Sequence, residues 1–329
     1  SMSLRGSSPA QVPVYLDGVL INRPDAGGAN VGALNPQSLE RIEVYRGSAP
    51  LTLGGASMGG AVHLHSGAGG GSVAGAATAR SYGGLVFEGG GQTVTGPWTL
   101  SLRARALRAD NDWEFADDRG TLYNADDDTI STRVNNDVRG GGGIASARRA
   151  LGPGDLAISA IADFSEHGLP GYSVRQSETA RGNSGLAQAQ ARWSTGRASG
   201  TRWREISAFT RFDHQGYEDP SGELSGRIRD RTDRALTVGT AASGAFSQDG
   251  APAWRLELSH AGQKSQDRAL TDGDFPDRTR TSGALAVQPA FGFFSERLLL
   301  SPGARLERNL DVEEGGPSDT LDATTLQFG

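Results

Sequence analysis

The feature that most constrains the fold is a two-residue alternation of apolar and polar side chains, which begins near Val73 and continues almost to the end of the chain. Because successive side chains of a β-strand point to opposite faces, this period indicates strands with one apolar face. The clearest stretches are 98–106, 155–164, 187–193 and 254–259. In the first of them, Trp98, Leu100, Leu102, Ala104 and Ala106 share one face, and Thr99, Ser101, Arg103 and Arg105 share the other.

The connections between these strands are of two kinds, which alternate along the chain. Tight connections are expected at 151–156, 194–202 and 247–254, and long polar ones at 110–138, 165–184, 213–233 and 262–281. This rhythm is typical of a meander with hairpin turns at one rim and large loops at the other, as in membrane barrels. The alternating runs with their flanks reach the ~9–11 residues of a membrane strand. At about 23 residues per strand and connection, residues 73–325 provide roughly eleven strands.

The N-terminal part of the chain is a compact unit of another kind. Short strands are expected on either side of Asp17-Gly18 and at 41–47, with a polar loop at 22–36 between them. Asp17-Gly18 itself is expected to form a turn, in which the aspartate side chain hydrogen-bonds to the turn backbone. A glycine-rich bend then leads to a last short strand, and the run SGAGGG at 66–71 reads as a linker. Two domains are therefore predicted, 1–70 and 71–329.

Composition excludes several classes of protein. The chain has no cysteine, so it has neither disulfides nor thiolate metal sites, and its net charge of -6 argues against a nucleic-acid partner. No apolar run approaches the ~18 residues of a membrane-spanning helix, and no signal peptide is recognisable at the start. The chain is therefore expected to be soluble and cytoplasmic, unless strands make the membrane contact or a segment precedes Ser1.

The motifs of the N-terminal unit resemble a known family. LRG at 4–6, VYLDGV at 14–19, LERIEVYRG at 39–47 and LGGASMGGAVHLHSG at 53–67 are similar, in order and spacing, to the second half of the plug domain of TonB-dependent outer-membrane receptors. The loops NDWEFADDRGTLYNADDDTISTRVNND and SEHGLPGYS resemble those of vitamin and siderophore receptors of that family. Recognisable motifs extend over roughly the first 175 residues, and the remainder agrees in its rhythm of strands and loops.

The resemblance implies an all-β transmembrane antiparallel barrel of about 22 strands, of which this chain holds roughly half, with a small α+β plug remnant inside. It also implies active uptake of a scarce small solute, such as a ferric siderophore or cobalamin, through the outer membrane of a Gram-negative bacterium. The expected partners are the solute, the lipid bilayer and the periplasmic protein TonB. A signal peptide, a TonB box and the first half of the plug are expected before Ser1, and further strands after Gly329.

The resemblance also assigns roles to residues of the N-terminal unit. An apical loop is expected to offer polar contacts to the solute from Asn22, Arg23, Asp25 and Asn30, the alternative being a loop without a ligand role. A latch between plug and barrel wall is expected at Arg41, Glu43 and Arg46, the alternative being solvated surface. Structural roles in a turn or a close backbone approach are expected for Asp17, Gly18, Gly54, Gly59 and Gly60.

The sequence offers two possible metal sites, and metal binding is the preferred interpretation of neither. His63 and His65 lie two apart, so both could reach one ion from the same strand face, but no third ligand is evident near them in the sequence. The aspartates Asp126, Asp127 and Asp128, with Asp117 and Asp118, could bind calcium, but a solvated acidic loop is the preferred interpretation. No resident metal or other cofactor is predicted.

Three functional classes remain in competition. The leading one is a TonB-dependent receptor fragment. The second is a soluble or secreted β-rich interaction or structural protein without transport activity, and the third is a secreted β hydrolase with two catalytic acids hidden among the loop aspartates. No catalytic constellation is visible in the sequence, so the chain is predicted not to be an enzyme.

Overall fold

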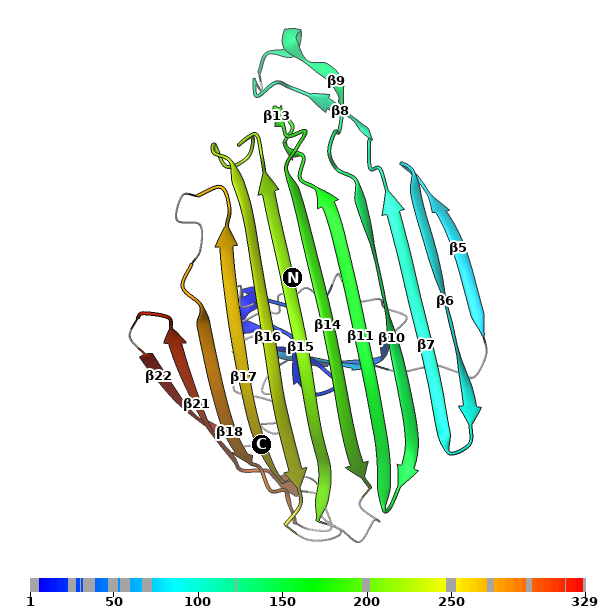
Figure 1. Ribbon diagram of the computed structural model, residues 1–329, viewed down its shortest axis with the longest axis vertical. Helices are drawn as coiled ribbons and strands as arrows, with labels where there is room; N and C mark the ends of the chain where they lie inside the picture. Colours follow the sequence, from blue (N-terminus) through cyan, green and yellow to red (C-terminus); the bar gives the residue numbers. More distant parts are fainter. Residues whose placement is uncertain are drawn as a thin grey trace.

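The computed structural model describes residues 6–22, 28–29, 31, 39–46, 53, 60–66, 73–121, 123–196, 202–246, 253–270, 275–293, 298–316 and 318–327. A twelve-stranded antiparallel sheet, here called the wall, dominates the chain, and a four-stranded sheet lies against its concave side (Figure 1). None of the helices among these residues is long and apolar enough to cross a membrane.

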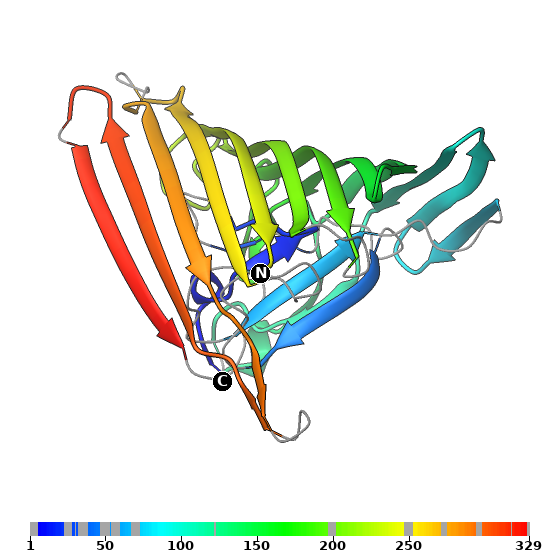
Figure 2. The same cartoon turned by 90° about the horizontal axis from the view of Figure 1, so that it is seen from below.

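The wall runs from edge to edge in nearly sequential order, β22-β21-β18-β17-β16-β15-β14-β11-β10-β7-β6-β5. Its strands are β5 (Ala74–Arg80), β6 (Gly84–Thr95), β7 (Trp98–Ala109), β10 (Val138–Leu151), β11 (Gly154–Gly168), β14 (Arg181–Thr195), β15 (Trp203–Asp219), β16 (Arg229–Gly244), β17 (Trp254–Asp267), β18 (Arg278–Val287), β21 (Gly303–Glu313) and β22 (Ser318–Gln327). Seen from below, they form an arc around the N-terminal strands, with β5 and β22 as its two open edges (Figure 2). The partial, open barrel that was predicted is confirmed.

The short elements outside the wall mark its connections. They are the pairs β8 (Glu114–Asp117) with β9 (Thr129–Thr132), β12 (Gly171–Tyr172) with β13 (Arg175–Gln176) and β19 (Phe291–Phe293) with β20 (Leu298–Leu300), and the 3₁₀ turns η1 (Pro9–Gln11) and η4 (Ala125–Asp127). The predicted loop at 110–138 does lie outside the wall up to residue 137, and Val138 begins β10.

Three other predicted loops are shorter than expected, because wall strands continue into polar sequence. Strand β11 extends to Gly168 and β14 starts at Arg181, so the loop predicted at 165–184 keeps only 169–180. The ladder of backbone hydrogen bonds persists after the apolar alternation stops, because strand pairing does not require an apolar face outside lipid. The wall also has twelve strands rather than the predicted eleven, since tight turns at 81–83 and 96–97 shorten two early connections.

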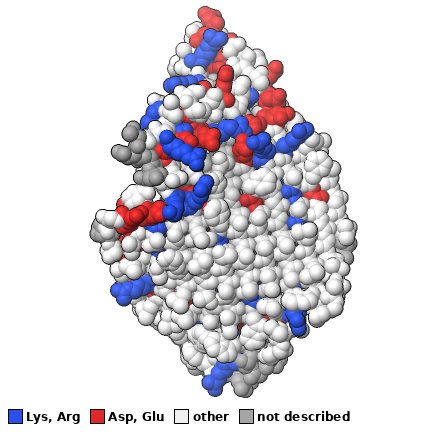
Figure 3. Space-filling view, in the orientation of Figure 1, with Lys and Arg blue, Asp and Glu red and all other residues white. Residues whose placement is uncertain are grey.

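The two faces of the wall have opposite chemistry. Large apolar side chains on the convex face are each between 39% and 63% exposed; they are Leu100, Leu102, Ile158, Phe164, Phe212, Leu236, Val238, Leu256, Leu258, Leu285, Leu306 and Leu310. Polar side chains on the concave face are buried; they include Asp163, Gln188, Gln190, Ser207, Arg211, Asp213, Asp233, Arg255 and Arg305. The convex face is largely uncharged across its middle, with charges gathered toward the loop end (Figure 3). Apolar outside and polar inside is typical of strands that span a bilayer.

Four of the five tryptophans lie at the rim that carries the short connections, and Trp113 lies in the long loop after β7. Trp98, Trp203 and Trp254 begin β7, β15 and β17, and Trp193 lies near the end of β14. The Trp203 and Trp254 rings meet edge to face with their centroids 5.4 Å apart. Aromatic side chains at one level of a sheet are expected at a membrane–water interface.

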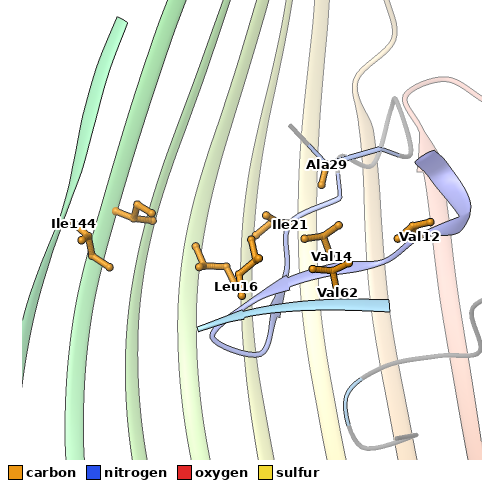
Figure 4. Close-up of a cluster of buried hydrophobic side chains, with 9 residues drawn as sticks. Val12, Val14, Leu16, Ile21, Ala29, Val62 and Ile144 are labelled. Carbon is orange, nitrogen blue, oxygen red and sulfur yellow. The ribbon is translucent and has the colours of Figure 1, made fainter. Parts of the chain in front are cut away.

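The N-terminal unit is a sheet of order β2-β1-β4-β3, made of β1 (Val14–Leu16), β2 (Val19–Leu20), β3 (Leu39–Tyr45) and β4 (Ala61–Ser66). Strand β1 pairs in parallel with β4, and β4 is antiparallel to β3. One face of this sheet packs on the wall through Val14, Leu16, Val62 and Leu64, which form a dry cluster with Ile144 and Ile161 of the wall (Figure 4). The domain boundary predicted at 70/71 lies outside the described residues, between β4 and β5.

Candidate functional site

The clearest contact between the N-terminal unit and the wall is made by Arg211 on β15. Its guanidinium donates to the carbonyl oxygen of Leu20 and, at 3.2 Å, to that of Asn22. Its Nε donates to the Asp213 carboxylate at 2.6 Å, and the Arg211 side chain is only 3% exposed. The alternation of β15 places both residues on the concave face. A buried wall cation therefore holds the main chain that follows β2.

The Asp17-Gly18 turn is a second contact. Both residues have positive φ, 51° and 84°, as the tight β1–β2 connection requires. The amide of Gln190 on β14 donates to the Asp17 carbonyl oxygen at 3.0 Å. The Asp17 carboxylate accepts from the backbone N–H of Ser66 at 2.9 Å and from the Ser66 hydroxyl. The sequence predicted bonds to the turn backbone instead, and this carboxylate fastens the turn to β4.

A network of charges lies beside the same turn. Arg255 on β17 pairs with Glu257 at 2.7 Å and with Glu205 at 3.3 Å, and Arg305 on β21 reaches Glu257 at 2.7 Å. Buried Tyr15 of β1 lies against this network, and burial, followed by the charge of Glu257, raises the pKa of its hydroxyl. The N-terminal unit and the concave wall enclose an open cleft of about 650 Å³ lined by these groups.

The predicted apical-loop residues are described only in part. The Asn22 side chain is engaged with its own unit, since its oxygen accepts from the Val14 N–H at 2.7 Å and its amide donates to the Val12 carbonyl at 3.0 Å. Arg23, Asp25 and Asn30 lie outside the described residues. Their contact with a solute stays a prediction.

The predicted latch residues face one another rather than the wall. Arg41 Nη2 lies 3.0 Å from a Glu43 carboxylate oxygen, and both side chains lie on one face of β3. Tyr45 donates to the Glu43 carboxylate at 2.9 Å, and Arg46 is exposed just after the strand. The ion pair expected across to the wall is not formed by Arg41 or Glu43 within the described part of the chain, because the antiparallel register with β4 supplies nearer partners. The latch role stays a prediction.

The remaining predicted residues have simple placements. Gly60 precedes β4 with φ of 107°, a conformation that favours glycine, whereas Gly54 and Gly59 lie outside the described residues. Asp126, Asp127 and Asp128 lie in or next to η4, where the Asp127 carboxylate accepts from the Thr121 hydroxyl at 2.7 Å. Calcium binding by this loop stays untested.

Two histidines of β4 meet a third potential metal ligand from β3. The register pairs His63 with Glu43 and His65 with Arg41, so all four side chains lie on the same face. Glu43 Oε2 lies 3.2 Å from His65 Nε2 and 3.9 Å from His63 Nδ1. Of the described residues, Glu43, His63 and His65 form the group whose ligand atoms lie within 4.8 Å of one another. Glu43 is thus a third potential ligand beside the two histidines, and the expectation that none lies near them was wrong.

Arginines on the lumen face were expected to meet the plug, but no individual wall residue was predicted to dock it. Arg211, Gln190, Arg255 and Arg305 occupy polar positions within otherwise apolar alternation, which was the available signal. Together with the apolar convex face, they define the class of this protein: a membrane β-barrel wall with a docked internal domain.

Comparisons with known proteins agree on the family. Residues 1–61 match the TonB-dependent Receptor Plug Domain. The vitamin B12 transporter BtuB of Vibrio vulnificus (strain YJ016) is 41% identical over 64 residues, which are 20% of this chain and 10% of that protein. The N-terminal unit is therefore a plug domain of the TonB-dependent receptors, and the predicted resemblance is confirmed.

Solved structures show that the likeness in fold extends over almost the whole chain. BauA, the ferric preacinetobactin receptor of Acinetobacter baumannii, superposes with a TM-score of 0.73 at 11% identity, over 96% of this chain and 53% of its own. The copper transporter OprC has a TM-score of 0.65 at 13% identity, over 98% of this chain and 52% of its own. The chain spans about half the length of these receptors and has the fold of a plug with part of the surrounding barrel.

Proposed function

We propose that this chain is the plug and adjoining wall of an outer-membrane receptor that takes up a scarce small solute, energised through TonB. A ferric siderophore, cobalamin or a similar chelate is the proposed class of solute. The observation that carries the proposal is the docking of the plug on a polar concave wall whose convex face is apolar. The apolar convex face and polar concave face argue against the soluble or secreted alternative, because in a soluble protein the convex leucines of β17 and β21 would be exposed to water.

The contacts between plug and wall suit a gate that must open. Arg211 and Gln190 donate to plug carbonyl oxygens, Leu20 and Asp17 among them, rather than to plug side chains. When the plug moves, water can satisfy each carbonyl, so separation does not strand an unpaired charge on the plug. The dry cluster around Ile144 and Ile161 is the part of the interface that resists movement.

The solute is proposed to meet the apical loop of the plug. Arg23→Ala and Asn30→Ala are expected to weaken equilibrium binding of the solute by the full receptor about tenfold or more, the loss of a charged or polar hydrogen bond, without unfolding it. Binding of labelled solute to purified outer membranes measures this. Unchanged affinity in both variants would remove the apical-loop assignment.

Uptake by whole cells tests the function itself. Cells that express the receptor carrying this chain are given radiolabelled cobalamin and a panel of ferric siderophores, with and without a functional TonB. Binding at the surface is expected in both strains, and accumulation only where TonB works. Recovery of the chain in the soluble fraction, or equal accumulation in both strains, contradicts the proposal.

A further inference from the structure

One face of the plug sheet, formed by β3 and β4, carries three potential metal ligands to which the proposed uptake gives no metal-binding role. Glu43 comes from β3, and His63 and His65 come from β4, whose two-residue period turns both imidazoles to the same side. Ligand atoms on a tetrahedral zinc ion with bonds of ~2.0–2.1 Å are about 3.3 Å apart. The Glu43 to His65 separation of 3.2 Å already fits, and the Glu43 to His63 separation of 3.9 Å needs only a small side-chain adjustment.

The three ligands are partly buried in the plug sheet. His63 presents its Nδ1 to Glu43, whereas its Nε2, at another position of the ring, is buried without a hydrogen-bond partner among the described residues. The side chains of His63, His65 and Glu43 are only 14%, 20% and 32% exposed, so the three ligands are partly shielded from solvent.

A neighbouring arginine occupies part of this site. Arg41 Nη2 lies 3.0 Å from Glu43 Oε1 and 3.4 Å from His65 Nε2, so it supplies the positive charge that an ion would otherwise bring. The Arg41 side chain is 62% exposed and can turn into solvent. Among the described residues, Arg41 is the cation with printed contacts to two of the ligands.

We propose that Glu43, His63 and His65 form a binding site for a divalent late first-row cation, with zinc as its best probe, and that Arg41 competes with the ion. Two imidazoles and a carboxylate are a donor set that zinc uses with an open fourth position. The bound ion bridges β3 to β4, since Glu43 belongs to one strand and both histidines to the other. Tyr45, through its hydrogen bond to Glu43, orients the carboxylate. The site does not depend on the proposed uptake.

The test uses the untagged protein in detergent and zinc alone. Zinc affinity is measured by competition with a chromophoric chelator, and Co²⁺ absorption reports whether the bound ion is tetrahedral. One ion per chain is expected. His63→Asn, His65→Asn and Glu43→Gln are each expected to weaken binding at least tenfold, by loss of a ligand. His260→Asn is the matched control, because His260 lies exposed on the convex face of β17.

Arg41→Gln keeps the proposal falsifiable if a ligand variant misfolds. Removal of a positive charge about 4–5 Å from the ion is expected to tighten binding about fivefold, and a misfolded plug cannot bind more tightly. Absence of zinc binding in the unmodified protein overturns the site. So does equal affinity in the unmodified protein, the two histidine variants and His260→Asn, and so does weaker binding in Arg41→Gln.

Discussion

Arg211→Met is the sharpest test of how the plug is held. The substitution keeps most of the apolar stem but removes the guanidinium that joins the Leu20 and Asn22 carbonyls to Asp213. The arginine is 3% exposed and the Asp213 side chain 8%, so solvent cannot easily replace the lost charge. The aspartate is left buried and unpaired, and two plug carbonyls lose a charged donor.

The size of the effect follows from this geometry. Removal of one partner of a buried ion pair costs roughly 3–5 kcal/mol. The two hydrogen bonds to carbonyls would add about 1.5–3 kcal/mol each if they were independent. Since all three contacts share one guanidinium they are not additive, and about 3–5 kcal/mol of plug docking is the expected loss.

Native-state hydrogen exchange of the plug measures this directly. The backbone N–H groups of Asp17 and Ile21 are bonded to Leu64 and Val14, so peptides that cover 12–22 report the opening of β1 and β2. A loss of 3–5 kcal/mol corresponds to exchange faster by roughly 10²–10⁴. Arg139→Met is the matched control: Arg139 also pairs with a carboxylate, Glu166 at 2.6 Å, but is 67% exposed, and its loss is worth under about 1 kcal/mol.

Exchange that rises less than fivefold in Arg211→Met, or equally in the Arg139 variant, would show that Arg211 does not hold the plug. The wall arginine would then be a lumen charge without a docking role.

Other consequences of the structure can be checked in the same protein. Leu258→Arg places a charge on the convex face, where Leu258 is 51% exposed, and is expected to cost about 2–4 kcal/mol in urea unfolding from vesicles, whereas a soluble sheet would tolerate it. Gly142→Ala is expected to destabilise by about 1–3 kcal/mol, since an added Cβ meets the Asp163 carboxylate, while Gly262→Ala, with open space around it, changes little. Hydrogen bonds from the preceding loop, first of all one from a serine hydroxyl, lower the pKa of the Glu223 carboxyl. The ionised carboxylate therefore contributes fully to the order of the two loops above its unfolded pKa of ~4.3. That contribution is lost as the pH falls through the lower pKa of the folded protein. Proteolysis of the loops should therefore rise in acid, and Glu223→Gln should abolish that dependence.

The faces of the wall strands were predictable from sequence, and the lengths of the strands were not. In 98–106, 155–164, 187–193 and 254–259, each predicted apolar side does lie on the convex face, because a period of two fixes the face once a strand is assumed. Strand β15 continues to Asp219, through residues that were predicted as loop. The prediction missed this end of the strand because it is polar, lies beyond the apolar band and carries no alternation. Hydrophobic pattern locates the membrane, whereas hydrogen-bond pairing decides where a strand ends.

The candidate metal site shows the same limit at the level of single residues. His63 and His65 were recognisable as a pair because two positions on one strand share a face whatever the strand pairs with. Glu43 is twenty residues earlier and was assigned to a latch, since no local pattern shows which strand lies beside it. Only the register of β3 against β4, which sets Glu43 opposite His63, brings the carboxylate to the imidazoles. The alternation of side chains along one strand can be recognised from the residues of that strand alone. Which residue lies opposite on the neighbouring strand depends on how both strands pack against the wall. A set of ligands that comes from two strands can therefore be recognised only once the fold is known.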